Sequence, residues 1–201
     1  NASLSRMMIG AEPPALNYRD RSPGDVVLHV DQLDLPRESP FGVDLVDVTM
    51  QVRAGEVVGI AGVSGNGQRE LLYALSGEDQ RAPAASIVIA KQPAGKLSPG
   101  RRRALGLHFV PEERLGRGAV PELGLAHNLL LTRREAVGTL GWLRTGQLRN
   151  QAVGIIDRFK VKAAGPNAPA RSLSGGNLQK FIMGREIDAK PTLLIVSQPT
   201  W

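Results

Sequence analysis

Hydrophobic and polar positions alternate in two segments that precede a continuous apolar run. Residues 26–30 and 43–52 follow this period-two pattern, which predicts half-exposed antiparallel strands. The next segment, EVVGIA at residues 56–61, is almost continuously apolar and predicts a short buried strand. Helical spacing follows at Leu71, Leu72 and Leu75. Gly77 predicts the end of that helix.

Helical and strand patterns continue in the second half of the chain. Residues 123–131 and 151–159 carry amphipathic helical patterns. Ser174 is a favoured N-cap residue for a further helix. The apolar stripe of that helix is expected to consist of Leu178, Phe181 and Ile182. Residues 193–196 are continuously apolar, which is typical of a parallel strand covered on both faces.

Composition restricts the classes of protein and site. With 201 residues, 42% hydrophobic and 22% charged, the chain can bury one substantial core, which predicts a single domain with a subdomain. Cysteine is absent and the three histidines are scattered, so we expect neither disulfides nor a metal site built from side chains. No apolar run is long enough to cross a bilayer and no secretory signal pattern is present, so we expect any membrane contact to be peripheral.

The net charge of +6 comes mainly from arginine and raises the alternative of nucleic-acid binding. Aromatic residues make up only 4% of the chain and no nucleic-acid-reading module is recognisable. We therefore expect no nucleic-acid partner, and we expect the run Arg101, Arg102 and Arg103 to be solvent-exposed.

A glycine-rich segment, GVSGNGQRE, links the predicted buried strand to the helix that follows it. Its first eight residues are Gly62, Val63, Ser64, Gly65, Asn66, Gly67, Gln68 and Arg69. At such a junction, backbone N–H groups and the helix dipole converge on an anion, and glycines let the main chain approach a phosphate. The phosphate-loop pattern G-x-x-x-x-G-K-[ST] is matched at Gly62 and Gly67 but fails at Gln68 and Arg69. The pattern alone leaves a phosphate-binding loop and a tight strand-to-helix turn both open.

Two further motifs carry a family resemblance. Residues 173–180 read LSGGNLQK and residues 193–200 read LLIVSQPT, so Ser197 follows Ser174 by 23 residues. Together with the glycine loop, they resemble the nucleotide-binding domain of ABC transporters, whose signature is LSGGQ and whose Walker B strand ends in Asp-Glu-Pro-Thr. The resemblance implies an α/β fold: a P-loop NTPase (RecA-like) core with an antiparallel β subdomain and a helical signature subdomain at about residues 114–180.

The resemblance also suggests domain boundaries. It extends from about residue 25 to residue 201, and the D-loop and switch histidine that the family places after Walker B are absent, so we expect a domain truncated at the C-terminus. Residues 1–24 are polar and punctuated by proline, and we interpret them as a tag remnant followed by an interdomain linker.

The resemblance implies roles for several residues. Phe41 occupies the place of an aromatic that stacks on the adenine of ATP, the alternative being a buried core aromatic, and Glu112 occupies the place of the Q-loop glutamine. The glycine loop would hold the phosphates of ATP. The signature would face an ATP molecule bound by a partner domain, and its residues are Ser174, Gly175, Gly176, Asn177 and Gln179.

The departures from the family pattern suggest a degenerate site. Gln68 replaces the lysine of the loop and Arg69 replaces the hydroxyl that holds Mg²⁺, so we expect Mg²⁺ to be weakly bound or absent. Ser197 and Gln198 replace the metal-orienting aspartate and the catalytic glutamate. Because glutamine cannot accept a proton from water, we expect negligible hydrolysis at this site, although the chain would remain part of an ATP-hydrolysing transport ATPase.

Partners follow from the branch of the family that the motifs resemble. VPEER, AHNLLL and GVSGNGQ are most similar to the second domain of fused-pair ATPases that energise importers of simple sugars and nucleosides. The implied partners are the first domain of the same chain, transmembrane permease subunits and, indirectly, an external substrate-binding protein. The implied location is the cytoplasmic face of the cell membrane. Two alternatives remain: an ABC-type ATPase without a permease, and a dinucleotide-binding oxidoreductase, for which Glu70 stands where a third glycine is needed.

Overall fold

The computed structural model describes residues 22–133, 138–139 and 142–199. One antiparallel sheet has the strand order β2-β1-β3-β4. Its strands are β1 (Val26–Leu35), β2 (Leu45–Arg53), β3 (Ile87–Ile89) and β4 (Gln92–Pro93). Both alternating segments are therefore confirmed as antiparallel strands, and the first continues five residues beyond residue 30.

One face of this sheet supplies the first hydrophobic core. Leu28, Val30 and Ile89 lie in that core together with Leu71 and Leu75 from α2 (Gln68–Ser76). Helix α2 ends at Gly77, which has a left-handed φ of 85° and donates its N–H to Tyr73 O. The predicted helix and its glycine stop are confirmed.

A short parallel sheet connects the first core to a second one. It pairs β5 (Leu107–Val110) with β8 (Leu193–Val196), in a register that joins Leu107 to Leu193 and Val110 to Val196. A six-residue helix, α3 (Pro99–Ala104), precedes β5. The predicted parallel strand at residues 193–196 is confirmed, but its cover on both faces is not: Leu193 is buried and the next three residues are half-buried.

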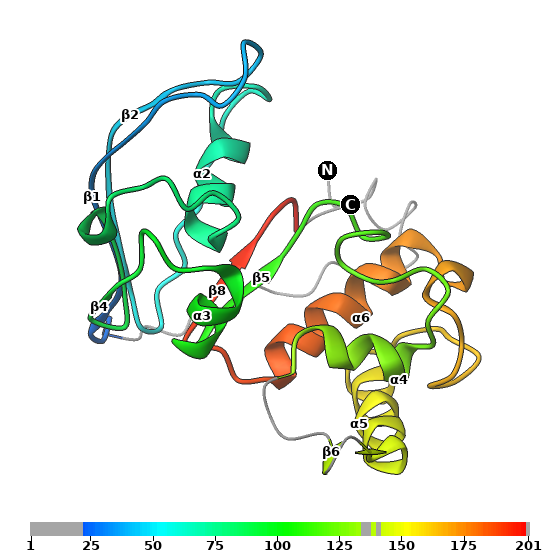
Figure 1. Ribbon diagram of the computed structural model, residues 1–201. Coiled ribbons are helices and arrows are strands. Elements are labelled where there is room, and N and C mark those ends of the chain that lie inside the picture. The colour runs from blue at the N-terminus through cyan, green and yellow to red at the C-terminus, as the bar shows by residue number, and fades with distance from the viewer. Residues whose placement is uncertain (1–21, 134–137, 140–141, 200–201) are drawn as a thin grey trace, which may run out of the picture.

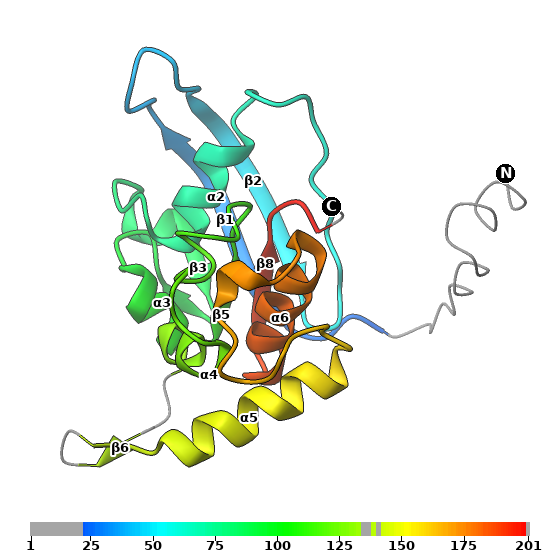
Figure 2. The same ribbon diagram turned by 90° about the vertical axis from the view of Figure 1, so that its right-hand side faces the viewer.

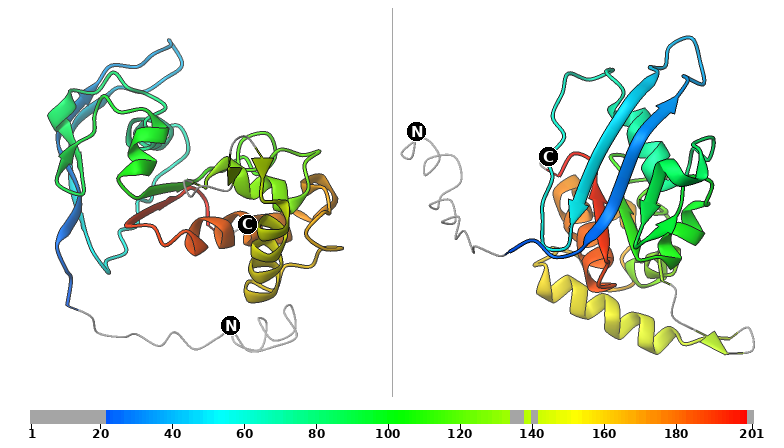
Figure 3. Two further views of the ribbon diagram at one scale, coloured as in Figure 1. Left: turned by 60° about the horizontal axis from the view of Figure 1, so that its bottom comes forward. Right: turned by 90° about the vertical axis from the view of Figure 1, so that its left-hand side faces the viewer.

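Helices surround the second core. They are α4 (Leu125–Asn128), the 3-10 turn η2 (Leu129–Leu131), α5 (Thr145–Arg158) and α6 (Gly175–Asp188). Two further 3-10 turns are η1 (Ala84–Ser86) and η3 (Ala170–Ser172). Two strands of two residues each, β6 (Gly138–Thr139) and β7 (Trp142–Leu143), pair as an antiparallel hairpin. Leu178, Phe181 and Ile182 are buried on α6, as the stripe predicted. Figures 1 and 3 show the antiparallel sheet and these helices on opposite sides of the parallel strands.

The expectation of a buried strand at residues 56–61 is wrong. The segment is an exposed loop, with Val57 95% and Ile60 56% exposed, and Figure 2 shows it running apart from the sheets between β2 and α2. A central strand needs ladder partners for its N–H and C=O groups. Among the described residues, no strand pairs with this segment, and the parallel sheet consists of β5 and β8.

The expectation that all three consecutive arginines are exposed is also wrong. Arg102 is fully buried and donates hydrogen bonds to the backbone carbonyls of Ala74, Leu75, Gly95 and Leu97. Burial lowers the pKa of Arg102 to about 10. Its guanidinium satisfies carbonyls at the end of α2 and in the following loop, which explains why a charged residue lies in the core.

The proposed tag remnant and most of the proposed linker, together with Trp201, lie outside the described residues. In the part of the chain that is described, no helix is long and apolar enough to span a membrane.

Candidate nucleotide-binding site

The glycine loop makes a tight turn directly before α2. Gly65 and Gly67 have φ values of 89° and 94°, in the left-handed region that favours glycine, and Gly67 is the N-cap residue of α2. The loop therefore joins an exposed segment, rather than a buried strand, to the N-terminus of a nine-residue helix. It retains the local turn and helix N-terminus on which phosphate binding depends.

Gln68 folds back into this loop. Its Nε2 donates to Val63 O at 3.1 Å, and its Oε1 accepts the backbone N–H of Asn66 at 3.2 Å. A Cβ atom at Gly62 would collide with the Gln68 amide. The residue in the lysine's place thus binds the loop itself and occupies one N–H group that the loop could otherwise offer to a phosphate.

Arg69 is the one basic residue of the segment GVSGNGQRE. Its side chain is 69% exposed, and its Nη2 lies 3.9 Å from Glu70 Oε1. Its charge also reaches Glu113, whose pKa is lowered by its own backbone N–H, by the hydrogen bond from Arg117 and, to a smaller extent, by Arg69. The Arg69 guanidinium is therefore exposed in the first turn of α2.

The carboxyl ends of the two parallel strands bring Glu112 and Gln198 together. Both residues lie two positions beyond the last ladder pair, Val110 and Val196. Gln198 Nε2 donates to Glu112 Oε1 at 2.7 Å, and Gln198 has a left-handed φ of 45°. Ser197 is buried, and its backbone N–H donates to Val110 O. This edge of a parallel sheet is where α/β proteins bind ligands.

The signature lies at the N-terminus of α6. Ser174 is its N-cap residue, as predicted, but its hydroxyl accepts from Asn177 Nδ2 at 2.9 Å instead of from a backbone N–H. Ser174, Gly175 and Gly176 are exposed. Gln179 is buried and accepts from Arg114 Nε at 3.0 Å, so its side chain faces the fold instead of the exposed helix end.

Phe41 lies in the turn between β1 and β2 and is 96% exposed. The alternative of a buried core aromatic is therefore wrong. An exposed ring on a hairpin is available to stack on a base.

Sequence reasoning missed the contacts made by Arg117. This residue bonds Glu113 and Glu78 and lies over the ring of Tyr73, with 4.8 Å from Cζ to the ring centroid. The spacing of four residues between Glu113 and Arg117 could have predicted their ion pair. The contacts of Arg117 with Tyr73 and Glu78 depend on tertiary structure and have no such signal in the sequence.

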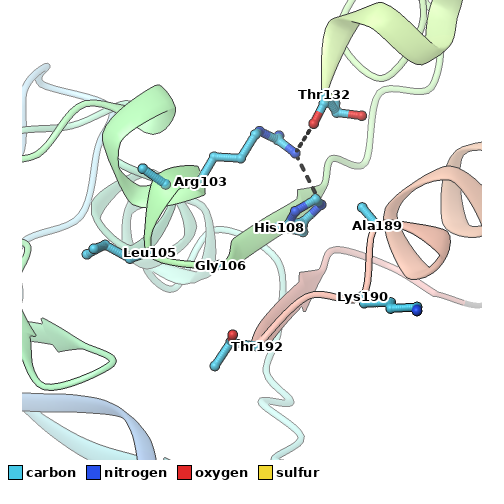
Figure 4. A pocket seen from close by; sticks show the side chains of 9 residues that line it. Arg103, Leu105, Gly106, His108, Thr132, Ala189, Lys190 and Thr192 are labelled. Atoms are coloured by element: carbon cyan, nitrogen blue, oxygen red, sulfur yellow. Dashed lines mark hydrogen bonds between the residues drawn. The ribbon is translucent and has the colours of Figure 1, made fainter. Parts of the chain in front are cut away.

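A cavity of about 390 Å³ lies at the opposite, amino ends of β5 and β8. Figure 4 shows Arg103 extended toward His108 and Thr132, with Lys190 across the cavity. Beside it, Glu186 is fully buried and binds His108, Arg103 and Arg185. No sequence pattern predicted this buried cluster of charged residues.

The side chains at the predicted site differ from the Mg²⁺ ligands that the family resemblance implies. Arg69 stands where a hydroxyl ligand is expected, and Gln198 is bonded to the nearby carboxylate of Glu112. Within the described ranges, no group of three His, Cys, Asp or Glu residues could hold a metal ion.

Comparison with known proteins establishes the family. Residues 45–201 match the ABC transporter family, and the chain belongs to it. The fold agrees with a nucleotide-free ATP-binding cassette from an ABC transporter (TM-score 0.67, 18% identity, covering 88% of this chain and 70% of that one). It also agrees with the MJ0796 bacterial ABC transporter cassette (TM-score 0.68, 19% identity, covering 86% and 74%). The predicted P-loop NTPase fold with its antiparallel sheet and helices is confirmed.

Curated relatives include importer subunits. The nucleoside import ATP-binding protein NupA of Lactococcus lactis is 36% identical, over 100% of this chain and 40% of its own length. The guanosine import ATP-binding protein NupO of Bacillus subtilis is 35% identical, over 98% and 39%. The xylose import ATP-binding protein XylG of Burkholderia ambifaria is 36% identical, over 96% and 38%. The chain thus spans about two fifths of the length of these relatives.

Proposed function

We propose that this chain is the second ATP-binding domain of a tandem ABC importer ATPase for nucleosides or simple sugars. The names of the similar relatives support an import role, and two of them, NupA and NupO, are named for nucleosides or guanosine. The loop sequence GNGQ supports the nucleoside branch, while VPEER and AHNLLL support the second position in the tandem.

In this proposal, the chain's own site binds nucleotide weakly, without Mg²⁺, and hydrolyses it negligibly. The Gln68 amide bonds the loop internally and supplies no positive charge. Gln198 can hydrogen-bond water but cannot act as a base, and loss of a positioned base costs about 10²–10⁴-fold in rate. Phe41 would stack on adenine and Arg69 would contact phosphate. Substitution of Arg69 by alanine should weaken nucleotide binding in a titration, and unchanged affinity would exclude this role.

The proposed contribution of this chain to ATP hydrolysis lies in its signature. The observation on which this rests is the exposed N-terminus of α6, where Ser174, Gly175 and Gly176 present a hydroxyl and backbone N–H groups with no acidic residue in the first turn. Such a surface suits the γ-phosphate of an ATP molecule that is bound by the first domain. The hydroxyl and the N–H groups would stabilise the charge on this phosphate during hydrolysis.

The test replaces Ser174 by tyrosine in the full-length protein and measures ATP hydrolysis. We expect turnover to fall by about two orders of magnitude, the range found when a transition-state donor is lost. The matched control is Ser172→Tyr, an exposed serine in η3 whose hydroxyl bonds Pro169 O. Full activity of Ser174→Tyr would contradict the proposed function.

Permease subunits are the proposed membrane partners, with an external binding protein acting through them, and the domain would lie on the cytoplasmic face of the membrane. An ABC-type ATPase without a permease is the alternative. Co-purification of the full-length protein with membrane-spanning subunits would support the importer, and its consistent failure from solubilised membranes would favour the alternative.

A further inference from the structure

Gln198 makes a hydrogen bond within the protein that the loss of a catalytic base does not explain. Its amide donates to Glu112 at 2.7 Å across 86 residues of sequence, and it does so from a left-handed backbone conformation. Non-glycine residues hold such a conformation only where surrounding contacts stabilise it. The hydrogen bond to Glu112 is the contact that can serve this purpose.

Glu112 belongs to a segment that we call the bridging loop, residues 111–121. The loop is ordered by its own hydrogen bonds, from Gly118 N to Glu113 O at 3.0 Å and from Ala119 N to Arg114 O at 2.7 Å. Its far end is fixed by Asn128, which is fully buried and exchanges hydrogen bonds with the backbone of Val120.

Side chains of the bridging loop contact three elements of the candidate site. Glu112 binds Gln198 after β8, Arg114 binds Gln179 of the signature helix, and Arg117 binds Tyr73 and Glu78 in and just beyond α2. Arg114 also lies against the first residue of α6, because a Cβ atom at Gly175 would be 2.6 Å from Arg114 Nη1. A shift of this loop would therefore displace the signature helix.

We propose that Gln198 is a positioning residue that fixes the bridging loop through Glu112 and thereby holds the signature helix in place for the partner domain. The inference rests on the proposed function of the signature. All the contacts come from side chains and backbone of this chain. The amide at position 198 thus has a structural partner, and its role does not depend on chemistry at this chain's own glycine loop.

The chemistry of the pair provides a specific test. The hydrogen bond joins an amide donor to a carboxylate acceptor, so exchanging the two residues preserves it. Gln198→Glu alone would place two carboxylates about as far apart as the amide and carboxylate are now, 2.7 Å, where they repel each other and, while both are ionised, have no hydrogen to bond through. The double exchange Glu112→Gln with Gln198→Glu restores one donor and one acceptor.

The variants are made in the full-length protein, together with its permease subunits, and two quantities are measured. The first is kcat for ATP hydrolysis. We expect it to fall about tenfold in Gln198→Glu, the factor of a lost hydrogen bond to a charged group, and to return to within about twofold in the double exchange. KM should change little, because the partner's own loop binds the nucleotide. The second is hydrogen–deuterium exchange of residues 111–121, which should speed up in the single variant and slow again in the double exchange.

Controls separate this inference from its alternatives. The double exchange places a glutamate at position 198, so it is also made in a background whose first-domain loop lysine is replaced by alanine. Turnover remaining there belongs to this chain's own site and is subtracted. Glu122→Gln, an exposed carboxylate just outside the bridging loop, is the matched control and should leave kcat and exchange unchanged.

The results distinguish a failure of the positioning role of Gln198 from a failure of the proposed function. Full kcat in Gln198→Glu, or failure of the double exchange to restore it, would overturn the positioning role. If Ser174→Tyr abolishes hydrolysis in the same preparation while Gln198→Glu does not, only this inference fails. If Ser174→Tyr is fully active, the proposed function fails as well. Should Gln198→Glu not fold, Gln198→Met removes the donor without adding charge and must give the same loss of kcat.

Discussion

Replacing Glu186 by glutamine perturbs the most highly charged part of the interior. The Glu186 side chain is fully buried on α6. Its Oε2 lies 2.7 Å from His108 Nδ1 and 3.0 Å from Arg103 Nη1, and its Oε1 accepts from Arg185 Nε at 2.7 Å. A carboxylate only accepts hydrogen bonds, so His108 must carry its hydrogen on Nδ1. The variant leaves two guanidinium groups, one of them fully buried, without their counter-charge.

The pKa of Glu186 gives the size of its contribution to the free energy of unfolding. Burial alone would raise it, but the hydrogen bond from His108 and the charges of Arg185 and Arg103 outweigh burial and lower the pKa from 4.5 to about 2. At about 1.4 kcal/mol for each pKa unit, the ionised form contributes about 3 kcal/mol to the free energy of unfolding. Because the folded-state pKa is depressed, this stability is fully present above pH 4.5 and is lost as the pH falls toward 2.

Urea unfolding of the purified protein, followed by circular dichroism at several pH values, measures this contribution. We expect Glu186→Gln to unfold with about 3 kcal/mol less free energy near pH 7, and the difference from the unmodified protein to shrink between pH 4.5 and 2. Exposed Glu122→Gln should change the free energy by less than about 0.5 kcal/mol. A difference below about 1 kcal/mol at pH 7, or one that does not depend on pH, would refute the electrostatic account.

Three further predictions concern other features. Arg102→Met leaves four backbone carbonyls without their donor and should destabilise the protein by about 3 kcal/mol in the same urea assay. Phe41→Ala should weaken binding of adenine nucleotides in a fluorescence titration without lowering the melting temperature, because the ring is 96% exposed. Gln68→Lys should tighten ATP binding about tenfold by calorimetry, because it adds a cation and frees the Asn66 N–H; unchanged affinity would contradict the role given to the loop.

Local patterns predicted the elements whose formation depends mainly on their own residues. The alternating positions of β1, the stripe at Leu178, Phe181 and Ile182, and the stop at Gly77 were all confirmed. Each depends on a periodicity or a backbone conformation that a few neighbouring residues determine. The motifs LSGGNLQK and LLIVSQPT at their spacing of 23 residues, together with the glycine loop, indicated the family correctly.

Features that depend on distant partners were not predictable in this way. Residues 56–61 have the composition of a central strand, but strand formation requires neighbouring strands that no local pattern supplies. The burial of Arg102 depends on carbonyls at residues 74 and 75 and on those of two loop residues nearby. The hydrogen bond between Glu112 and Gln198 depends on the register of β5 with β8, which motif comparison alone does not give.

The two amides of the candidate site have changed in the same way. Where the family resemblance implies a lysine and a glutamate, this chain has Gln68 and Gln198, so one positive and one negative charge are lost together. Both amides now bond the protein, Gln68 within the glycine loop and Gln198 to Glu112. A neutral amide can make such bonds without leaving a charge uncompensated. In the proposed function, the two replacements exchange groups that would act on nucleotide for groups that bond the surrounding loops, as expected of a domain whose signature completes the site of another domain.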